Sequence, residues 1–245
     1  MRIGSGRGAV VLVVAVAVLL SARASDGPPP SPAVASAPSA VGSAPWPVRI
    51  MPLGASSTVG TGSPATAGYR GPLLALLARD GIAVDLVGSQ HDGPASMPDR
   101  DHEGHGGWTL ARLQPFVAGW VRAQRPDVVL LHAGTNDLLQ GVSAAVAAQR
   151  LEAVLDALRA APDVRVVVAG VWAPLPGRTT ERAEFAALAA ALVARRRALG
   201  QPISYVDTSA LLGPSDFTDE LHANAAGYRR IAAMWHREIR LALPR

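Results

Sequence analysis

Short apolar runs and longer amphipathic stretches alternate along the chain from Val48 onwards. Runs rich in Val, Ile and Leu are typical of buried strands, and apolar residues that recur every three or four positions are typical of helices. Strands are expected at residues 48–53, 83–87, 127–133, 164–171 and 203–206. Helices are expected at residues 69–80, 110–124, 143–161, 180–199 and 224–243, and a long polar loop at residues 89–108.

This alternation predicts an α/β fold, in which a five-stranded parallel sheet is covered by helices on both faces. Binding sites in such sheets form beyond the carboxyl ends of the strands. In this chain polar motifs follow the first, third and fifth predicted strands, and another lies in the loop after the second. We therefore expect these motifs to meet at one edge of the sheet.

The first 24 residues have the pattern of a secretory signal peptide. Arg2 and Arg7 precede an unbroken apolar run at residues 9–20, and Ala22-Arg23-Ala24 ends it with small residues at the spacing of a cleavage site. The apolar run is shorter than the roughly 20 residues that a membrane-spanning helix needs. We expect cleavage after Ala24, export from the cell and no stable membrane anchor; an uncleaved anchor helix is the alternative.

Residues 25–47 are dominated by Pro, Ser, Ala and Gly, a composition that cannot bury a core and predicts a linker. The folded domain is therefore expected at residues 48–245.

The chain contains no lysine, so all its basic side chains apart from histidine are arginines. It also contains no cysteine, and this absence excludes disulfides, thiolate metal sites and a cysteine nucleophile. Its net charge of +4 includes three arginines of the predicted signal peptide, and the other arginines are interspersed with acidic residues. This pattern does not favour a nucleic-acid partner.

Ser56 is the candidate nucleophile, because it stands in the tight Gly54-Ala55-Ser56-Ser57-Thr58 turn after the first predicted strand. A serine hydrolase needs an exposed hydroxyl, a base, a group that orients the base, and donors for the oxyanion. Serines also commonly cap turns, which is the alternative for Ser56. The turn lacks the Gly-x-Ser-x-Gly pattern of the α/β-hydrolases.

His222 is the candidate base and Asp219 its orienting group. An aspartate three residues before a histidine can reach the imidazole Nδ1–H, which leaves Nε2 free to accept a proton. The alternative is a pair at the start of a helix, and Asp207 is a second possible orienting group.

Four residues are candidates for contacts with a substrate. The Asn136 amide can donate to an oxyanion or cap a turn. Gly107 lacks a Cβ, so its backbone N–H can approach a ligand closely. Trp108 can stack on a sugar ring or belong to the core of its loop, and the same two alternatives hold for Trp172.

Together these motifs resemble the SGNH (GDSL-like) hydrolase family. The blocks are Gly54-Ala55-Ser56, Gly107, Gly134-Thr135-Asn136-Asp137 and Asp219-x-x-His222, in the order of that family. The resemblance implies a flavodoxin-like three-layer α/β/α sandwich and a catalytic triad of Ser56, His222 and Asp219. It also implies an oxyanion hole made by the backbone N–H groups of Ser56 and Gly107 and the Asn136 side chain. No cofactor is implied.

The residues 88–109 stretch resembles a narrower group, carbohydrate esterase family 3, whose members are acetylxylan esterases. The residues on which this resemblance rests include Pro98-Asp99-Arg100-Asp101-His102-Glu103-Gly104-His105 and Gly107-Trp108-Thr109. The chain departs from the family at Ala55, where an Asp is usual, and at Glu220 and Ala223, where Gly and Pro are usual. Loss of the Asp before Ser56 is expected to loosen the hydrogen bonds of this turn.

The expected substrate is therefore an acetylated polysaccharide, such as xylan, or a small ester. The alternatives are a lipolytic or small-ester hydrolase of the same superfamily and a carbohydrate-binding relative with little or no catalysis.

The Asp99–His105 cluster has metal-ligand side chains but lacks a recognisable ligand spacing, so no metal site is assigned there. His132, inside a predicted strand, is expected to be buried and hydrogen-bonded. The oligomeric state is not predicted.

Overall fold

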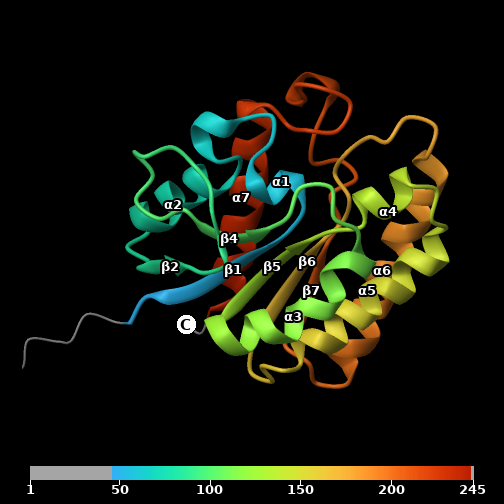
Figure 1. The fold of residues 1–245 in the computed structure, drawn as a ribbon, viewed down its shortest axis with the longest axis horizontal. Helices are drawn as coiled ribbons and strands as arrows, with labels where there is room; N and C mark the ends of the chain where they lie inside the picture. Colours follow the sequence, from blue (N-terminus) through green and yellow to red (C-terminus); the bar gives the residue numbers. More distant parts are fainter. Residues whose placement is uncertain (1–45, 244–245) are drawn as a thin grey trace, which may run out of the picture. The chain divides into compact units, whose positions relative to one another are not determined.

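The structure is a computed structural model that describes residues 46–243 (Figure 1). The predicted signal peptide and all but the last two residues of the predicted linker lie outside the described residues. Among the described residues, no helix is long and apolar enough to cross a bilayer.

The described residues form one sheet around the central strand β1 (Val48–Gly54). On one side, β1 pairs in parallel with β5 (Val128–His132), which is followed by β6 (Arg165–Ala169) and β7 (Ile203–Val206). On its other side, β1 pairs in parallel with β2 (Val84–Leu86) and then with β4 (Asp101–Gly104). The short β3 (Gln90–His91) pairs with β4 in the antiparallel direction.

The prediction of five strands is wrong in number, because β3 and β4 lie where a polar loop was predicted. β4 has the sequence Asp-His-Glu-Gly, yet His102 and Glu103 are fully buried. The His102 ring accepts the Gly104 N–H at 3.0 Å, and Glu103 accepts the Ser89 N–H at 2.8 Å and its hydroxyl at 2.7 Å. A strand that buries polar side chains through such bonds leaves no apolar pattern in the sequence.

The five long predicted helices are present, with bounds close to those expected. They are α2 (Arg70–Arg79), α3 (Leu110–Gln124), α5 (Ala144–Leu158), α6 (Thr179–Ala198) and α7 (Ala225–Ala242). Two short helices were not predicted, α1 (Ser56–Val59) after β1 and α4 (Thr135–Leu139) after β5. Short 3-10 turns cover Pro64–Thr66 and Pro214–Asp216.

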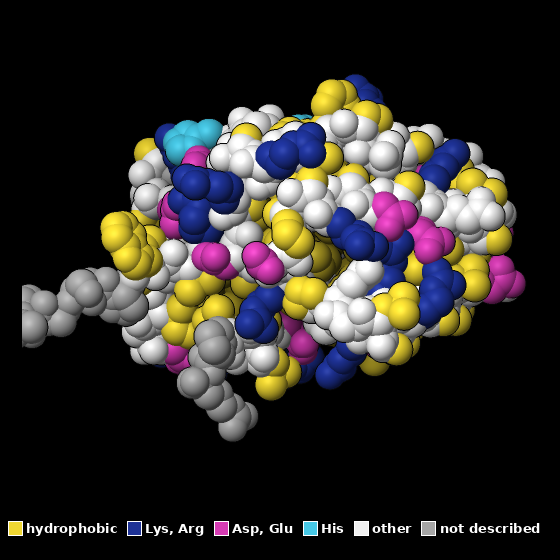
Figure 2. Space-filling model, turned by 90° about the horizontal axis from the view of Figure 1, so that it is seen from below, with side chains coloured by type: hydrophobic (Ala, Val, Ile, Leu, Met, Phe, Trp, Pro, Cys, Tyr) yellow, Lys and Arg dark blue, Asp and Glu magenta, His cyan; other side chains and the backbone are white. Residues whose placement is uncertain are grey.

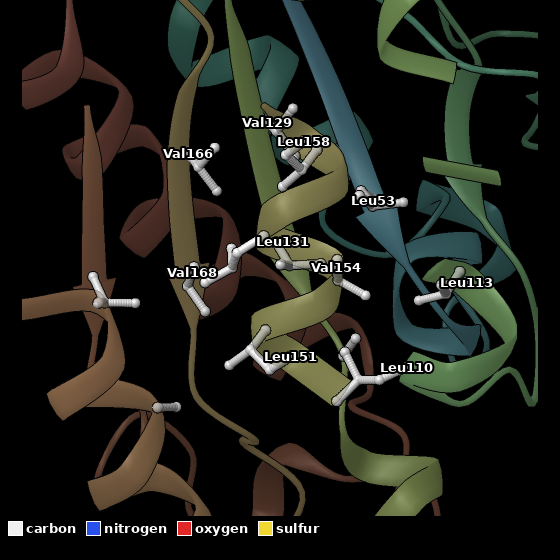
Figure 3. Close-up of a cluster of buried hydrophobic side chains, with 14 of the residues drawn as sticks. Leu53, Leu110, Leu113, Val129, Leu131, Leu151, Val154, Leu158, Val166 and Val168 are labelled. Carbon is white, nitrogen blue, oxygen red and sulfur yellow. The ribbon is translucent and has the colours of Figure 1, made fainter. Parts of the chain in front are cut away.

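Helices α2 and α7 cover one face of the sheet, and α3, α5 and α6 cover the other (Figure 1). Along β5, Val129 and Leu131 face the second group of helices, while Val128 and Leu130 face the first. Figure 3 shows Val129 and Leu131 packed against Leu151, Val154 and Leu158 of α5. Alternate side chains of β5 thus face opposite helix layers, and the strand is buried on both faces. The fold is the predicted three-layer α/β/α sandwich.

The surface of the domain carries both signs of charge. On the face seen in Figure 2, arginine and acidic side chains are dispersed among apolar and polar ones. A pocket of about 320 Å³ lies between the ends of α5 and α6, lined mainly by apolar side chains such as Leu155, Leu158 and Ile203. It contains none of the candidate site residues.

We expect Leu131→Ala to lower the free energy of unfolding by about 2–5 kcal/mol, because the fully buried leucine leaves a cavity between sheet and helix. Leu199→Ala is the matched control: this leucine is 75% exposed, and its loss should change the free energy by less than about 0.5 kcal/mol. Equal effects in urea denaturation would contradict the burial of β5 between two layers.

Candidate active site

Four loops meet beyond the carboxyl ends of the strands and enclose a pocket of about 230 Å³. They follow strands β1, β4, β5 and β7, as expected for a parallel sheet. The pocket is lined by Ala55, Ser56, Ser57, Thr61, Gly107, His132, Ala133, Thr135, Asn136, Leu221 and His222. The structure therefore brings Ser56, Gly107, Asn136 and His222 together from four separate parts of the chain.

Ser56, His222 and Asp219 form a continuous line of hydrogen bonds. The Ser56 Oγ lies 3.0 Å from His222 Nε2, although 166 residues separate the two in the sequence. His222 Nδ1 lies 2.8 Å from Asp219 Oδ2 on the other side of the ring. When Nδ1–H donates to Asp219, the Nε2 lone pair faces the serine hydroxyl, which is the tautomer a general base requires.

The Asp219 carboxylate is fixed by the backbone of its own loop. Its Oδ1 accepts the N–H groups of Leu221 and His222, both at 2.7 Å. Slight burial acts to raise the pKa of Asp219, but the hydrogen bonds from the His222 ring and from these two N–H groups outweigh it and lower the pKa. The carboxylate is thus held in its charged form beside the imidazole. Asp207, the alternative orienting group, instead accepts bonds from Ser209 N–H and Oγ.

The loop that presents His222 is anchored at the start of α7. The Thr218 N–H donates to the His222 carbonyl at 2.9 Å, and Phe217 pairs with Ala223 in an antiparallel bridge. Asn224 then caps α7, since its Oδ1 accepts the N–H groups of Ala226 and Gly227. His222 therefore stands two residues before the N-cap of α7. The alternative of a solvated helix-start pair does not describe its position.

Ser56 is the first residue of α1, so its backbone N–H has no acceptor within that helix. The Ala55 carbonyl closes the turn by accepting the N–H groups of Thr58 at 2.9 Å and Val59 at 3.2 Å. Ala55 is 6% exposed and lines the pocket. Backbone hydrogen bonds therefore hold this turn without a carboxylate at position 55.

Arg70 provides a second support for the serine turn, which the sequence did not reveal. Its fully buried guanidinium donates to the carbonyls of Thr58 and Val59, both at 3.0 Å. It also donates to the carbonyls of Asp92 at 2.7 Å and Arg100 at 2.6 Å. One side chain thus ties α1 to the segment before β4. Nothing in the sequence spacing around Arg70 indicates these acceptors.

Asn136 and Gly107 both line the pocket. An Asn136 Nδ2–H donates to the Trp108 carbonyl at 2.9 Å, which leaves its second N–H available. Gly107 has a φ of +76°. The neighbouring Asp137 is fully buried and accepts the Leu110 N–H at 2.8 Å and an Arg150 N–H at 2.9 Å. Asn136 and Asp137 therefore bind the start of α3 to α4.

The acidic and histidine residues at 99–105 have structural partners. Asp99 accepts the N–H groups of Leu86 at 2.6 Å and Asp101 at 3.1 Å. Asp101 contacts the His91 ring, and Glu103 lies 2.7 Å from His105 Nε2. Among the described residues, no group of three or more His, Asp or Glu side chains is arranged to hold a metal ion.

The prediction for His132 is wrong in one respect. The residue is buried, but neither ring nitrogen has a hydrogen-bond partner among the described residues. Its ring instead stacks on Trp172, with centroids 3.3 Å apart and planes 3° apart. Trp172 is 2% exposed and so belongs to the core. Burial lowers the pKa of His132 to about 3, so the ring is neutral at ordinary pH.

A three-layer α/β/α sandwich with hydrogen-bonded serine, histidine and aspartate at its carboxyl edge is the arrangement of a serine hydrolase. The family model for the GDSL-like Lipase/Acylhydrolase family matches residues 53–230. This chain belongs to that family.

The chain is similar in sequence and fold to carbohydrate esterases. A family 3 carbohydrate esterase from Clostridium thermocellum is 33% identical, with a TM-score of 0.72 over 80% of this chain and 96% of that one. An acetyl esterase mutant with an acetate ion is 26% identical, with a TM-score of 0.69 over 80% of this chain and 98% of that one. A multidomain esterase from Ruminococcus flavefaciens is 27% identical over 78% of this chain, which spans only 28% of that relative.

We expect His132→Phe to weaken the loss of stability at acid pH. The folded-state pKa of His132 lies below its unfolded value of about 6.5, so its stabilising contribution is complete above that pH and is lost as the pH falls towards about 3. The variant removes this contribution, and its free energy of unfolding should fall less than that of the wild type between about pH 7 and 4. Equal slopes for wild type and His132→Phe would refute the buried neutral ring.

Proposed function

We propose that this protein is a secreted serine esterase that removes acetyl groups from xylan or a related polysaccharide. The observation that supports it most is the hydrogen-bonded line from Asp219 through His222 to the Ser56 hydroxyl. The similarity to a family 3 carbohydrate esterase and to an acetyl esterase supports the acetyl group. The signal pattern in residues 1–24 supports secretion.

Acylation begins when Ser56 Oγ attacks the acetyl carbonyl carbon and His222 Nε2 takes the hydroxyl proton. The carbonyl π bond breaks, and the negative charge moves onto its oxygen. We assign stabilisation of this oxyanion to the N–H groups of Ser56 and Gly107 and the free N–H of Asn136. The ester bond then breaks as the leaving alcohol oxygen takes the proton from His222, and Ser56 remains acetylated.

Deacylation repeats these steps with water. His222 removes a proton from a water molecule while the water oxygen attacks the acetyl-serine carbonyl. Collapse of the second oxyanion breaks the bond to Ser56 Oγ, which recovers its proton from His222, and acetate leaves. Asp219 orients the ring and stabilises the imidazolium in both halves of the reaction. The residues named here require no cofactor for this scheme.

The size of the pocket supports a short acyl group. Its volume of about 230 Å³ is below the roughly 300–1,000 Å³ typical of pockets for drug-sized ligands. An acetyl group fits such a space, whereas a long acyl chain would have to extend over the surface. A pocket of this volume favours an acetyl esterase over the lipolytic alternative.

We expect Ser56→Ala to lower acetate release from acetylated xylan or nitrophenyl acetate by about 10⁴-fold or more, because no other group supplies the nucleophile. Ser57→Ala is the matched control, since Ser57 is the adjacent hydroxyl and is nearly buried. It should keep most of the activity, with both variants folded by circular dichroism. If Ser56→Ala retains acetate release and Ser57→Ala loses it, Ser57 is the nucleophile instead.

The substrate is tested by the rate of acyl release across acetylated xylan, acetylated chitin oligomers, pectin and nitrophenyl esters of increasing chain length. The proposal expects acetyl esters of a polysaccharide to be the fastest. Faster release of long acyl chains would instead identify a lipolytic enzyme. Glycan binding in isothermal titration with no hydrolysis of any ester would identify a carbohydrate-binding relative.

A further inference from the structure

His105 lies outside the proposed triad and oxyanion hole, yet it begins the turn that presents Gly107. The four residues His105-Gly106-Gly107-Trp108 form a β-turn, closed by the Trp108 N–H donating to the His105 carbonyl at 3.1 Å. Gly107 occupies the third position with a φ of +76°, as a type II turn requires. The turn's own hydrogen bond leaves the Gly107 N–H unused. The direction of that N–H therefore depends on how firmly the two ends of the turn are held.

The side chains at the two ends of this turn stack on each other. The rings of His105 and Trp108 have centroids 4.2 Å apart and planes 20° apart. The His105 ring also stacks on Trp120 of α3, at 4.9 Å and 11°. The imidazole thus links the turn to α3, a helix that packs on the sheet.

Trp108 is partly buried and packs against the hydrophobic core. Its ring stacks on His105, and the Arg112 guanidinium carbon lies 4.5 Å from its centroid. The Phe116 ring lies against it with centroids 5.6 Å apart. Of the two alternatives for Trp108, these contacts favour the loop core.

The edge of the His105 ring is fixed by a buried carboxylate. Its Nε2 lies 2.7 Å from Glu103 Oε1, and Glu103 is fully buried. The same carboxylate accepts both the N–H and the hydroxyl of Ser89, so its own position is set. A ring held at its edge by this bond and stacked on two indoles has little rotational freedom.

Two hydrogen bonds connect this turn to the other two proposed oxyanion donors. The His105 N–H donates to the Gly54 carbonyl at 2.9 Å, two residues before Ser56. At the other end, the Trp108 carbonyl accepts the Asn136 amide. A shift of the turn would therefore change the spacing of all three donors.

We infer that His105 is a positioning residue, which through its stack on Trp108 and its bond to Glu103 aims the Gly107 N–H at the oxyanion. This inference rests on the proposed function, because it assigns His105 to the transition state of that reaction. His105 does not line the pocket, and the contribution assigned to it is geometric. Preorganised donors act only when they already lie where the charge develops.

The test compares three replacements of His105 by steady-state kinetics on nitrophenyl acetate. His105→Ala removes the stack and the bond to Glu103, His105→Phe keeps a flat ring, and His105→Gln keeps only a hydrogen-bond donor. We expect His105→Ala to lower kcat by about 10- to 100-fold with KM changed less than about threefold, because a displaced donor is felt only in the transition state. His105→Phe should recover more of kcat than His105→Gln. His91→Ala, at an exposed histidine of the preceding segment, is the control and should match the wild type.

A second measurement follows the Gly107 amide directly by ¹⁵N relaxation and hydrogen exchange. We expect His105→Ala to raise the mobility and exchange rate of this amide, His105→Phe to restore both in part, and His91→Ala to leave both unchanged. Thermal melts identify any variant that does not fold. If His105→Ala does not fold, His105→Gln decides, since it lacks the ring on which the inference depends.

The inference is overturned if the deciding variant keeps kcat within twofold of the wild type, or if only its KM rises. It is also overturned if the Gly107 amide is as rigid in that variant as in the wild type. If the wild-type protein hydrolyses no ester, the proposed function is wrong. The amide measurement would then still decide whether His105 holds the turn.

Discussion

Strand β1 is paired on both sides up to its last residue, and the geometry of the site depends on this pairing. Gly54 lies opposite Gly104 of β4 on one side and His132 of β5 on the other. A Cβ at Gly54 would lie 2.2 Å from the His132 carbonyl oxygen, so the backbones can approach this closely only because residue 54 is glycine. The turn that follows thus presents Ser56 from a fixed point, beside the loops that follow β4 and β5.

Polar side chains then fix these loops to one another. Arg70 binds carbonyls of the serine turn, Asp137 binds the start of α3, and Glu103 binds Ser89 and His105. Each of these three groups is fully buried, and each makes at least two hydrogen bonds. A buried charge that lost such partners would be costly, so the loops have little freedom to move apart. The turn at Ala55 is consistent with this account, because backbone bonds and Arg70 hold it where relatives usually have an aspartate.

The parts of the fold and site that depend on local pattern could be predicted from the sequence, and the parts that depend on long-range polar contacts could not. Five strands and five helices follow from apolar periodicity, and the Asp219–His222 contact follows from a spacing of three residues. Sites in parallel sheets form beyond the carboxyl ends of the strands, and this rule predicts that Ser56 and His222 lie close together. The sequence does not give the distance between them. β4 was missed because its buried residues are polar, and the acceptors of Arg70 lie on segments 11 to 30 residues away. For the same reason, nothing in the sequence predicts that the His132 nitrogens lack a partner among the described residues, or that His105 stacks on two indoles.

The central claim is that Ser56 is activated by His222 and acts as a nucleophile. Labelling with a fluorophosphonate, followed by peptide mass mapping, tests it most directly, because this reagent forms a stable adduct only with an activated serine. The account predicts one adduct, on Ser56, with loss of esterase activity in proportion to labelling, and greatly slowed labelling of a His222→Ala variant. An adduct on another residue, or rapid labelling that does not depend on His222, would contradict it.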